Sequence, residues 1–283
     1  GLRDVDRALA RGLTYLLEAQ NEAGGFVTTK GESGPVAQGV LYADGIASLT
    51  VVEAFALTRE RRYALPMRHA LSRLVKAQNE EGWWPYVRNG EKDIVASVWA
   101  AHALQTAQRF GWGSALGVNT ALDRFDTWLD GVSTFVVSRA ADSRQTGSRA
   151  FASGAAAVVA VRKAREIAST GDLAQMSVLL RDYYTPSFAP ARGIGAQKLP
   201  NVNFLAWYFG SLAAHQEQAP PTSNEFLNRL FGTLVSDGKA NFAEFNIDGT
   251  ELEREQGFVY CDALAALAIE NAYRLRTRTL RRD

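Results

Sequence analysis

The residues with the clearest potential for chemistry are acidic residues that recur at the start of similar apolar segments. Asp44 opens D-G-I-A-S-L and Asp93 opens D-I-V-A-S-V. Asn203 and Asp262 open the related segments N-F-L-A-W-Y and D-A-L-A-A-L. A carboxylic acid that its surroundings keep protonated can donate a proton to a substrate, whereas a carboxylate can bind a cation, a sugar or an amine. Asp93 and Asp44 are therefore the candidate catalytic residues.

The position of these acidic residues also predicts a structural role. In each segment an alanine follows three and ten residues later, which places the polar residue and both alanines on roughly one face of a helix. An aspartate at a helix N-terminus accepts unpaired backbone N–H groups and complements the helix dipole. Because the residue recurs and an enzyme needs one acid rather than a ring, the pattern favours capping over catalysis for Asp44, Asp93 and Asp262.

A second kind of segment repeats as well, and it predicts the outer helices. Residues 8–26, ALARGLTYLLEAQNEAGGF, return 58 positions later as HALSRLVKAQNEEGWW. These segments have wide leucine faces and charged backs, to which Arg73 and Lys76 are assigned. The glycines that follow predict left-handed residues that stop the helices, and the glutamine amides are expected to satisfy backbone groups freed there.

The alternation of the two kinds of helix predicts the fold class. Apolar residues recur at helical spacing throughout, and no segment alternates as a sheet would. We therefore expect an all-α fold, an α/α toroid of about five to six helical hairpins with inner and outer rings. No linker divides the chain, so 1–283 is predicted to be a single domain. The expected helices cover 3–20, 36–58, 63–79, 92–110, 115–134, 147–168, 172–184, 200–217, 222–236 and 257–276.

Composition narrows the classes of function. The net charge of +1 gives no nucleic-acid footprint. With one cysteine and three histidines, no metal site and no other cofactor are predicted. No apolar run approaches the roughly 20 residues of a membrane span, so no transmembrane segment is expected. The chain is expected to be soluble, and the sequence leaves open whether it is cytoplasmic or exported with a signal removed.

Several residues are predicted to line a cavity between the inner helices. Aromatic side chains there can form an apolar wall or stabilise a carbocation, although aromatics at helical spacing are also typical of a core. Glu53 and His102 both lie nine residues after their aspartate and could form an acid–base pair, or could be polar groups satisfied inside a buried helix. The predicted cavity residues are Tyr42, Glu53, Trp99, His102, Asn203, Trp207, Tyr260 and Asp262.

The pattern R-G-x-x-Y-L-x-x-x-Q-x-x-x-G-x-F at 11–26, with its copy at 69–84, resembles the QW repeat of squalene cyclases and protein prenyltransferases. The chain as a whole resembles bacterial proteins that contain prenyltransferase and squalene oxidase repeats. This resemblance implies an α/α toroid with a central cavity. In class II terpene cyclases the third letter of D-x-D-D-T-A is the acid, and 91–96 and 42–47 keep that letter as Asp93 and Asp44 but lack the final aspartate.

The prenyltransferase side of the resemblance implies a zinc site that this sequence does not reproduce. That zinc is held by an Asp-x-Cys pair and a distant histidine. Here Cys261 directly precedes Asp262, and Tyr260 stands where a histidine would be needed. No metal ligands are therefore assigned.

Three classes of function remain open. The missing motifs favour a non-catalytic toroid that binds an isoprenoid or another small molecule in its cavity, or a protein partner. The resemblance favours an isoprenoid cyclase with Asp93 or Asp44 as general acid. A carbohydrate-active lyase, epimerase or hydrolase would need two carboxylates roughly 5–10 Å apart, which Asp44 and Asp93 would have to supply.

Overall fold

The protein is all-α, as the sequence predicts. The computed structural model describes residues 2–26, 41–86, 90–142, 149–166, 204–216, 221–236, 239–240 and 262–271. Their only strands are the two-residue β1 (Val235–Ser236) and β2 (Lys239–Ala240), which pair antiparallel. The chain divides into two compact units, Gly1–Val132 and Ser133–Asp283. A single domain over 1–283 stays a prediction.

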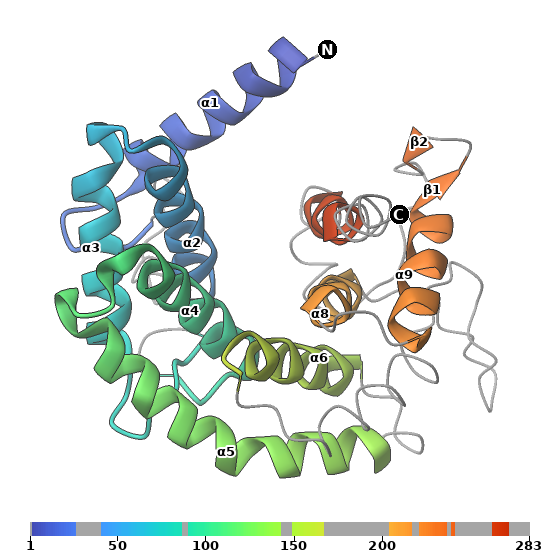
Figure 1. Ribbon diagram of the computed structural model, residues 1–283. Helices are drawn as coiled ribbons and strands as arrows, with labels where there is room; N and C mark the ends of the chain where they lie inside the picture. The colour runs from blue at the N-terminus through green and yellow to red at the C-terminus, as the bar shows by residue number, and fades with distance from the viewer. Residues whose placement is uncertain are drawn as a thin grey trace. The chain divides into compact units, whose positions relative to one another are not determined.

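Unit 1 contains the helices α1 to α5, among which α2, α3 and α4 pack together (Figure 1). Helix α2 packs side by side with α4 and also against α3. A π-helical turn, Gln108–Trp112, and a 3-10 turn, Ala115–Gly117, connect α4 to α5. The helices are α1 (Leu2–Ala19), α2 (Leu41–Thr58), α3 (Arg61–Ala77), α4 (Ile94–Ala107) and α5 (Val118–Asp142), the last of which contains the division between the units.

Helices α2 and α4 are apolar on nearly every face and pack against each other. The alanines predicted at the close-packing positions are all buried: Ala47, Ala54, Ala96 and Ala103. The helices approach so closely that a Cβ added to Gly45 would lie 3.0 Å from the Cβ of Trp99. Small residues at helical spacing therefore bring these two backbones together, as predicted.

Helix α3 is amphipathic and contributes one face to the core. Its buried residues recur at intervals of three and four, which is the spacing of one helical stripe: Tyr63, Met67, Ala70, Leu71 and Leu74. The opposite face carries exposed residues such as Arg62, Leu65 and Arg68. This division of faces is the one that the sequence predicts for an outer helix.

Unit 2 repeats the pattern of apolar helices in contact. It contains α6 (Arg149–Ala164), α8 (Phe204–Gln216), α9 (Pro221–Leu234) and a helix over 262–271. Helix α8 packs against α6 and α9. The amide of Asn271 donates to the Ser211 hydroxyl at 3.1 Å and ties the last described helix to α8. The predicted close-packing alanines Ala206, Ala213 and Ala265 are buried.

Several helix boundaries differ from the predicted ones. The helix expected over 222–236 ends at Leu234, because Val235 and Ser236 form β1. The helix expected over 115–134 begins at Val118 and continues to Asp142. The helix expected over 92–110 covers Ile94–Ala107, and residues 108–110 belong to the π-helical turn. The helix expected over 172–184 lies outside the described residues.

Candidate functional site

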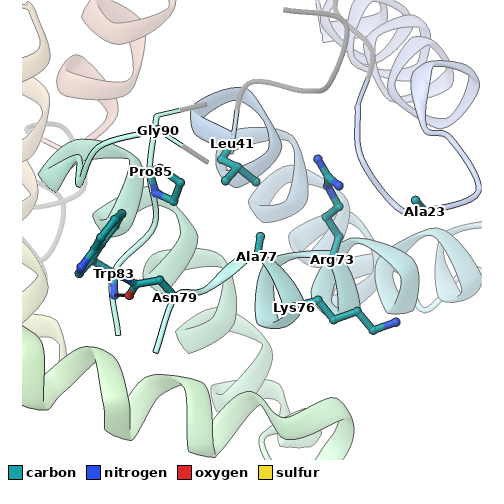
Figure 2. A pocket seen from close by; sticks show the side chains of 9 residues that line it. All are labelled: Ala23, Leu41, Arg73, Lys76, Ala77, Asn79, Trp83, Pro85 and Gly90. Carbon is teal, nitrogen blue, oxygen red and sulfur yellow. Dashed lines mark hydrogen bonds between the residues drawn. The ribbon is translucent and has the colours of Figure 1, made fainter. Parts of the chain in front are cut away.

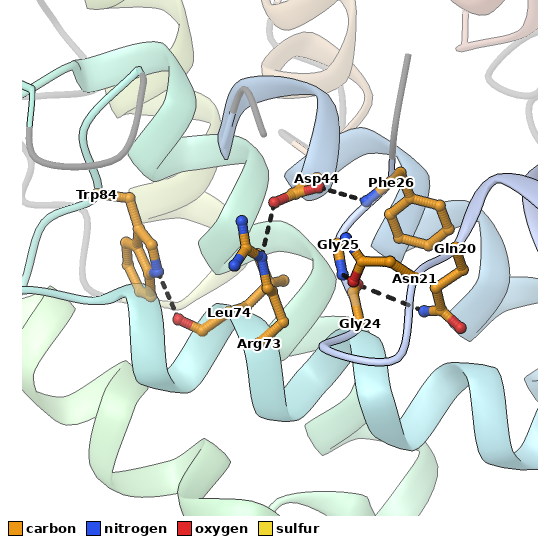
Figure 3. A network of polar contacts seen from close by, with 9 residues as sticks. All are labelled: Gln20, Asn21, Gly24, Gly25, Phe26, Asp44, Arg73, Leu74 and Trp84. Carbon is orange, nitrogen blue, oxygen red and sulfur yellow. Dashed lines mark hydrogen bonds and ion pairs between the residues drawn. The ribbon is translucent and has the colours of Figure 1, made fainter. Parts of the chain in front are cut away.

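The turn that follows α1 is a compact, hydrogen-bonded structure (Figure 3). The Asn21 side chain accepts from the Gly25 N–H at 3.0 Å, and the Asn21 N–H donates back to the Gly25 carbonyl at 2.9 Å. Gly24 has a φ of +84°, and an added Cβ would collide with the His69 carbonyl of α3. Glycine is required there for its backbone conformation and for the close approach of α3.

The turn after α3 repeats this geometry. The Asn79 side chain accepts from the Trp83 N–H at 3.0 Å, and the Asn79 N–H donates to the Trp83 carbonyl at 3.0 Å. Gly82 has a φ of +100°, and its added Cβ would collide with the Arg124 carbonyl of α5. The sequence repeat is therefore a structural repeat. The predicted left-handed glycines are confirmed, although each lies in the turn five residues beyond the last helical residue.

The glutamine at the start of each turn links the helix before it to a later amphipathic helix. The Gln20 amide donates to the Pro66 carbonyl of α3 at 2.9 Å, and the Gln78 amide donates to the Ala121 carbonyl of α5 at 2.8 Å. Gln78 also donates to the Gly82 carbonyl at 2.9 Å. The prediction that these amides satisfy freed backbone groups is confirmed. The sequence did not predict that each glutamine also donates to a backbone carbonyl of a later amphipathic helix.

Asp44 lies inside the first unit and holds three segments together. Its Oδ1 accepts from the Phe26 N–H at 2.8 Å, and its Oδ2 pairs with the Arg73 guanidinium at 3.0 Å (Figure 3). The Asp44 side chain has no exposed surface. Burial raises its pKa above the ordinary value, while the Phe26 hydrogen bond and the Arg73 charge act in the opposite direction. Both oxygens of this carboxylate have structural partners.

Asp93 occupies the equivalent position of the repeat but has a different role. It is the N-cap of α4, and its Oδ1 accepts from the Ala96 N–H at 2.7 Å. Burial raises its pKa, and the Ala96 and Val95 amides act against that shift. Capping, the role favoured for the aspartates, is therefore what Asp93 does. Asp44 instead lies within the first turn of α2, because that helix begins at Leu41.

No hydrogen bond joins the two aspartates in the part of the chain that the structure describes. Phe26 and Arg73 are the partners of Asp44, whereas Ala96 is the partner of Asp93, and neither aspartate shifts the pKa of the other. The carboxylate pair that a carbohydrate-active enzyme would require stays a prediction.

Four of the predicted cavity residues lie in the described helices and make ring contacts. Tyr42 is buried with its ring centroid 5.6 Å from that of Tyr86. Trp99 is buried and stacks on His102 at 6.4 Å. Burial, and to a smaller extent the Arg109 charge, lower the pKa of His102 to about 4. In unit 2, Trp207 is buried edge-on against Phe204 at 5.3 Å.

The remaining predicted residues divide between described and undescribed parts of the chain. Glu53 is exposed on α2, and no hydrogen bond or ion pair of the described residues joins it to His102. Asp262 is half-buried at the start of its helix. Asn203 and Tyr260 lie outside the described residues.

A cleft of about 520 Å³ lies between the two turn copies and the ends of α2 and α3 (Figure 2). Arg73 and Lys76 supply its charged groups, Asn79 supplies an amide and Trp83 an aromatic ring. Apolar side chains and a glycine complete the lining: Ala23, Leu41, Ala77, Pro85 and Gly90.

The sequence analysis missed this cleft because it gave the turn residues only the roles of ending helices and of satisfying backbone groups. The assignment of Arg73 to an outward charged back is wrong: its side chain is only 15% exposed and turns toward Asp44. One signal was present in the sequence: the two copies share the same turn residues. Such a repeat indicates that the second turn and the end of α3 lie beside the first turn.

Two further properties bear on function. Among the described residues no three histidine, cysteine or acidic side chains are grouped so that they could hold a metal ion. Helix α2 is long and apolar enough to cross a membrane, but 61% of it is buried inside the protein, as is typical of a core helix.

Comparisons with known proteins assign no function to the chain, so a functional proposal depends on its geometry. The chain matches no family model, no curated protein and no solved structure.

Proposed function

We propose that the protein is a non-catalytic α/α toroid that binds a small molecule in the cleft between its first two turn copies. The cleft carries this proposal. It combines cations, an amide and an indole ring within one concavity, and its volume of about 520 Å³ lies in the usual range for small-ligand sites. The toroid of five to six hairpins is part of the proposal. It is supported by the inner pair α2–α4 and by the glutamine links between successive outer helices.

The bonding of the two candidate acids supports binding over catalysis. A general acid must present a proton to the substrate. Asp44 is fully buried with a backbone amide and a guanidinium on its two oxygens, so its carboxylate form is the one that its partners stabilise. Asp93 caps its own helix. These roles account for both aspartates without a reaction.

Native mass spectrometry of the purified full chain tests the proposal. We expect the wild-type protein to carry a bound small molecule that Ala77→Trp, which fills the cleft, does not carry. Ala115→Trp is the control, because Ala115 is exposed and lies outside the cleft lining. The same bound mass on all three proteins, or its loss from the control alone, would contradict the proposal.

One observation favours the isoprenoid-cyclase alternative, and a separate experiment addresses it. Burial raises the pKa of Asp93, which is the direction that a proton donor requires. If Asp93 is that donor, a squalene-like substrate should be turned over by the wild type and not by Asp93→Asn. Equal turnover by both proteins, or none by either, would remove this alternative for the substrate tested.

A further inference from the structure

We infer that the ligand of this cleft is an amphipathic organic anion, a carboxylate or similar oxyanion joined to an apolar or aromatic body. The inference rests on the proposed function, because it specifies the chemistry of the ligand that the cleft takes. The charges, the apolar lining and the helix ends of the cleft lead to it separately.

Among the described residues, the two charged groups that line the cleft are both cationic. Lys76 is exposed, and it makes no hydrogen bond or ion pair with any residue that the structure describes. Arg73 is fixed in place because its Nε donates to Asp44 at 3.0 Å. The acidic residues of the turns, Glu22, Glu80 and Glu81, are exposed and lie outside the lining. A negative group in the cleft would therefore face Lys76 and the guanidinium of Arg73, whose charge Asp44 balances.

Asn79 and Trp83 are held in positions that suit such a ligand (Figure 2). The Asn79 side-chain oxygen is occupied by the Trp83 N–H, whereas its NH₂ group donates to no residue within the described ranges. The Trp83 indole N–H donates to Glu81 at 2.9 Å, which fixes the orientation of the ring. The amide can therefore donate to an oxyanion while the indole face packs against an apolar body.

The helix ends beside the cleft also favour a negatively charged ligand. Helix α2 begins at Leu41, so the positive end of its dipole lies at the cleft wall. Helix α3 ends at Ala77 and brings its negative end to the same region. The carbonyl of Leu74 in its last turn is already covered by the Gln78 N–H at 3.2 Å and the Trp84 indole at 2.7 Å. The negative end is thus partly satisfied within the protein.

The volume and lining of the cleft also exclude the smallest anions as a good fit. A single inorganic phosphate or sulfate would leave most of the 520 Å³ unfilled and would not contact Leu41, Pro85 and Trp83 together. An apolar body of one ring with a short chain would cover these side chains and remove their surface from water.

Three probes with the same apolar body test the inference: 4-phenylbutyrate, 4-phenylbutanamide and 4-phenylbutylammonium. Binding to the full chain is measured by calorimetry and by tryptophan fluorescence, with Trp83→Phe identifying the contribution of that ring. We expect the anion to bind about fivefold more tightly than the amide and the cation to bind most weakly. The preference for the anion should decline as salt is added.

Substitution of Lys76 separates charge from shape. Lys76→Gln should reduce the affinity for 4-phenylbutyrate to near that of the amide and leave the amide affinity unchanged. Arg68→Gln is the matched control, because Arg68 is an exposed cation of α3 outside the cleft lining. Since both side chains are exposed, both variants should fold as the wild type does, which circular dichroism checks.

The possible outcomes distinguish the inference from the proposed function. Equal binding of the three probes, or tightest binding of the ammonium, would overturn the anion inference while leaving a ligand-binding cleft. Equal loss of anion affinity in Lys76→Gln and Arg68→Gln would also overturn it, because the effect would then come from net charge. Failure of all three probes to bind, together with no mass difference between wild type and Ala77→Trp, would overturn the proposed function itself.

Discussion

Asp44 and Arg73 form an ion pair in which the carboxylate is fully buried and the guanidinium is 15% exposed, with 3.0 Å between Oδ2 and Nε. The pair joins the first turn of α2 to α3. The second oxygen of Asp44 holds the Phe26 N–H, so one carboxylate connects two helices and the first turn copy. The guanidinium that this pair fixes is also a wall of the proposed ligand cleft. Stability and binding are therefore coupled at Arg73.

Arg73→Met should lower the free energy of unfolding by about 3 kcal/mol, because it leaves the buried Asp44 carboxylate without its cation. The double variant Asp44→Asn/Arg73→Met should recover part of this loss, since no buried charge remains. Chemical denaturation followed by circular dichroism measures both. Arg229→Met, which breaks the exposed Arg229–Glu225 pair, is the control and should change stability by less than about 0.5 kcal/mol. Equal effects of Arg73→Met and Arg229→Met on the free energy of unfolding would show that the buried ion pair stabilises the protein no more than the exposed one.

The low pKa of His102 predicts a loss of stability in mild acid. Burial lowers that pKa from 6.5 to about 4, so between these values the unfolded chain binds a proton that the native protein does not. The contribution is complete above pH 6.5 and is lost as the pH falls toward 4, by about 3 kcal/mol in total. His102→Gln should flatten this part of the curve of unfolding free energy against pH. His69→Gln is the matched control for loss of an imidazole. A curve unchanged by His102→Gln would refute the assignment.

The glycines of the two turns should tolerate no side chain. Gly24→Ala and Gly82→Ala each place a Cβ against a backbone carbonyl of the next outer helix and force a left-handed conformation on alanine. We expect each to cost more than about 1 kcal/mol. Gly12→Ala, in the exposed face of α1 where an added Cβ meets nothing within 4 Å, should instead stabilise by up to about 1 kcal/mol. Thermal unfolding of the three variants decides this, and a loss of stability in Gly12→Ala equal to the other two would contradict the steric argument.

The repeats in the sequence predicted the packing of the helices better than they predicted the candidate functional site. The alanines after Asp44 and Asp93 are buried because helical periodicity alone determines which face they share. The direction of Arg73 could not be predicted in this way. Its position on α3 allows either flank of the helix to face solvent, and its partner Asp44 lies 29 residues earlier in the chain. Only the packing of α2 against α3 brings the two charges together.

The same limit explains why two similar motifs have different structures. Asp44 and Asp93 begin equivalent segments, yet α2 starts three residues before Asp44 and α4 starts one residue after Asp93. In the first repeat the Asp44 side chain accepts from Phe26 in the preceding turn. In the second repeat the Asp93 side chain is instead the N-cap of α4. Where a helix begins depends on the loop before it, and the loops before these two helices are unrelated in sequence.

This difference leads to a prediction at Ser48 and Ser97, which occupy equivalent positions of the two segments. In the second repeat the Ser97 hydroxyl accepts the buried Trp84 N–H at 2.8 Å, the role that Asp44 plays for Phe26 in the first. The Ser48 hydroxyl is buried and has no hydrogen-bond partner among the described residues. Ser97→Ala should therefore cost about 2 kcal/mol by leaving a buried amide unpaired, whereas Ser48→Ala should be neutral or stabilising. Denaturation of the two variants side by side provides the measurement, with each serine serving as the control for the other. Equal destabilisation by both would mean that the first and second repeats hold their turns in the same way, against the hydrogen bonds described for Asp44 and Ser97.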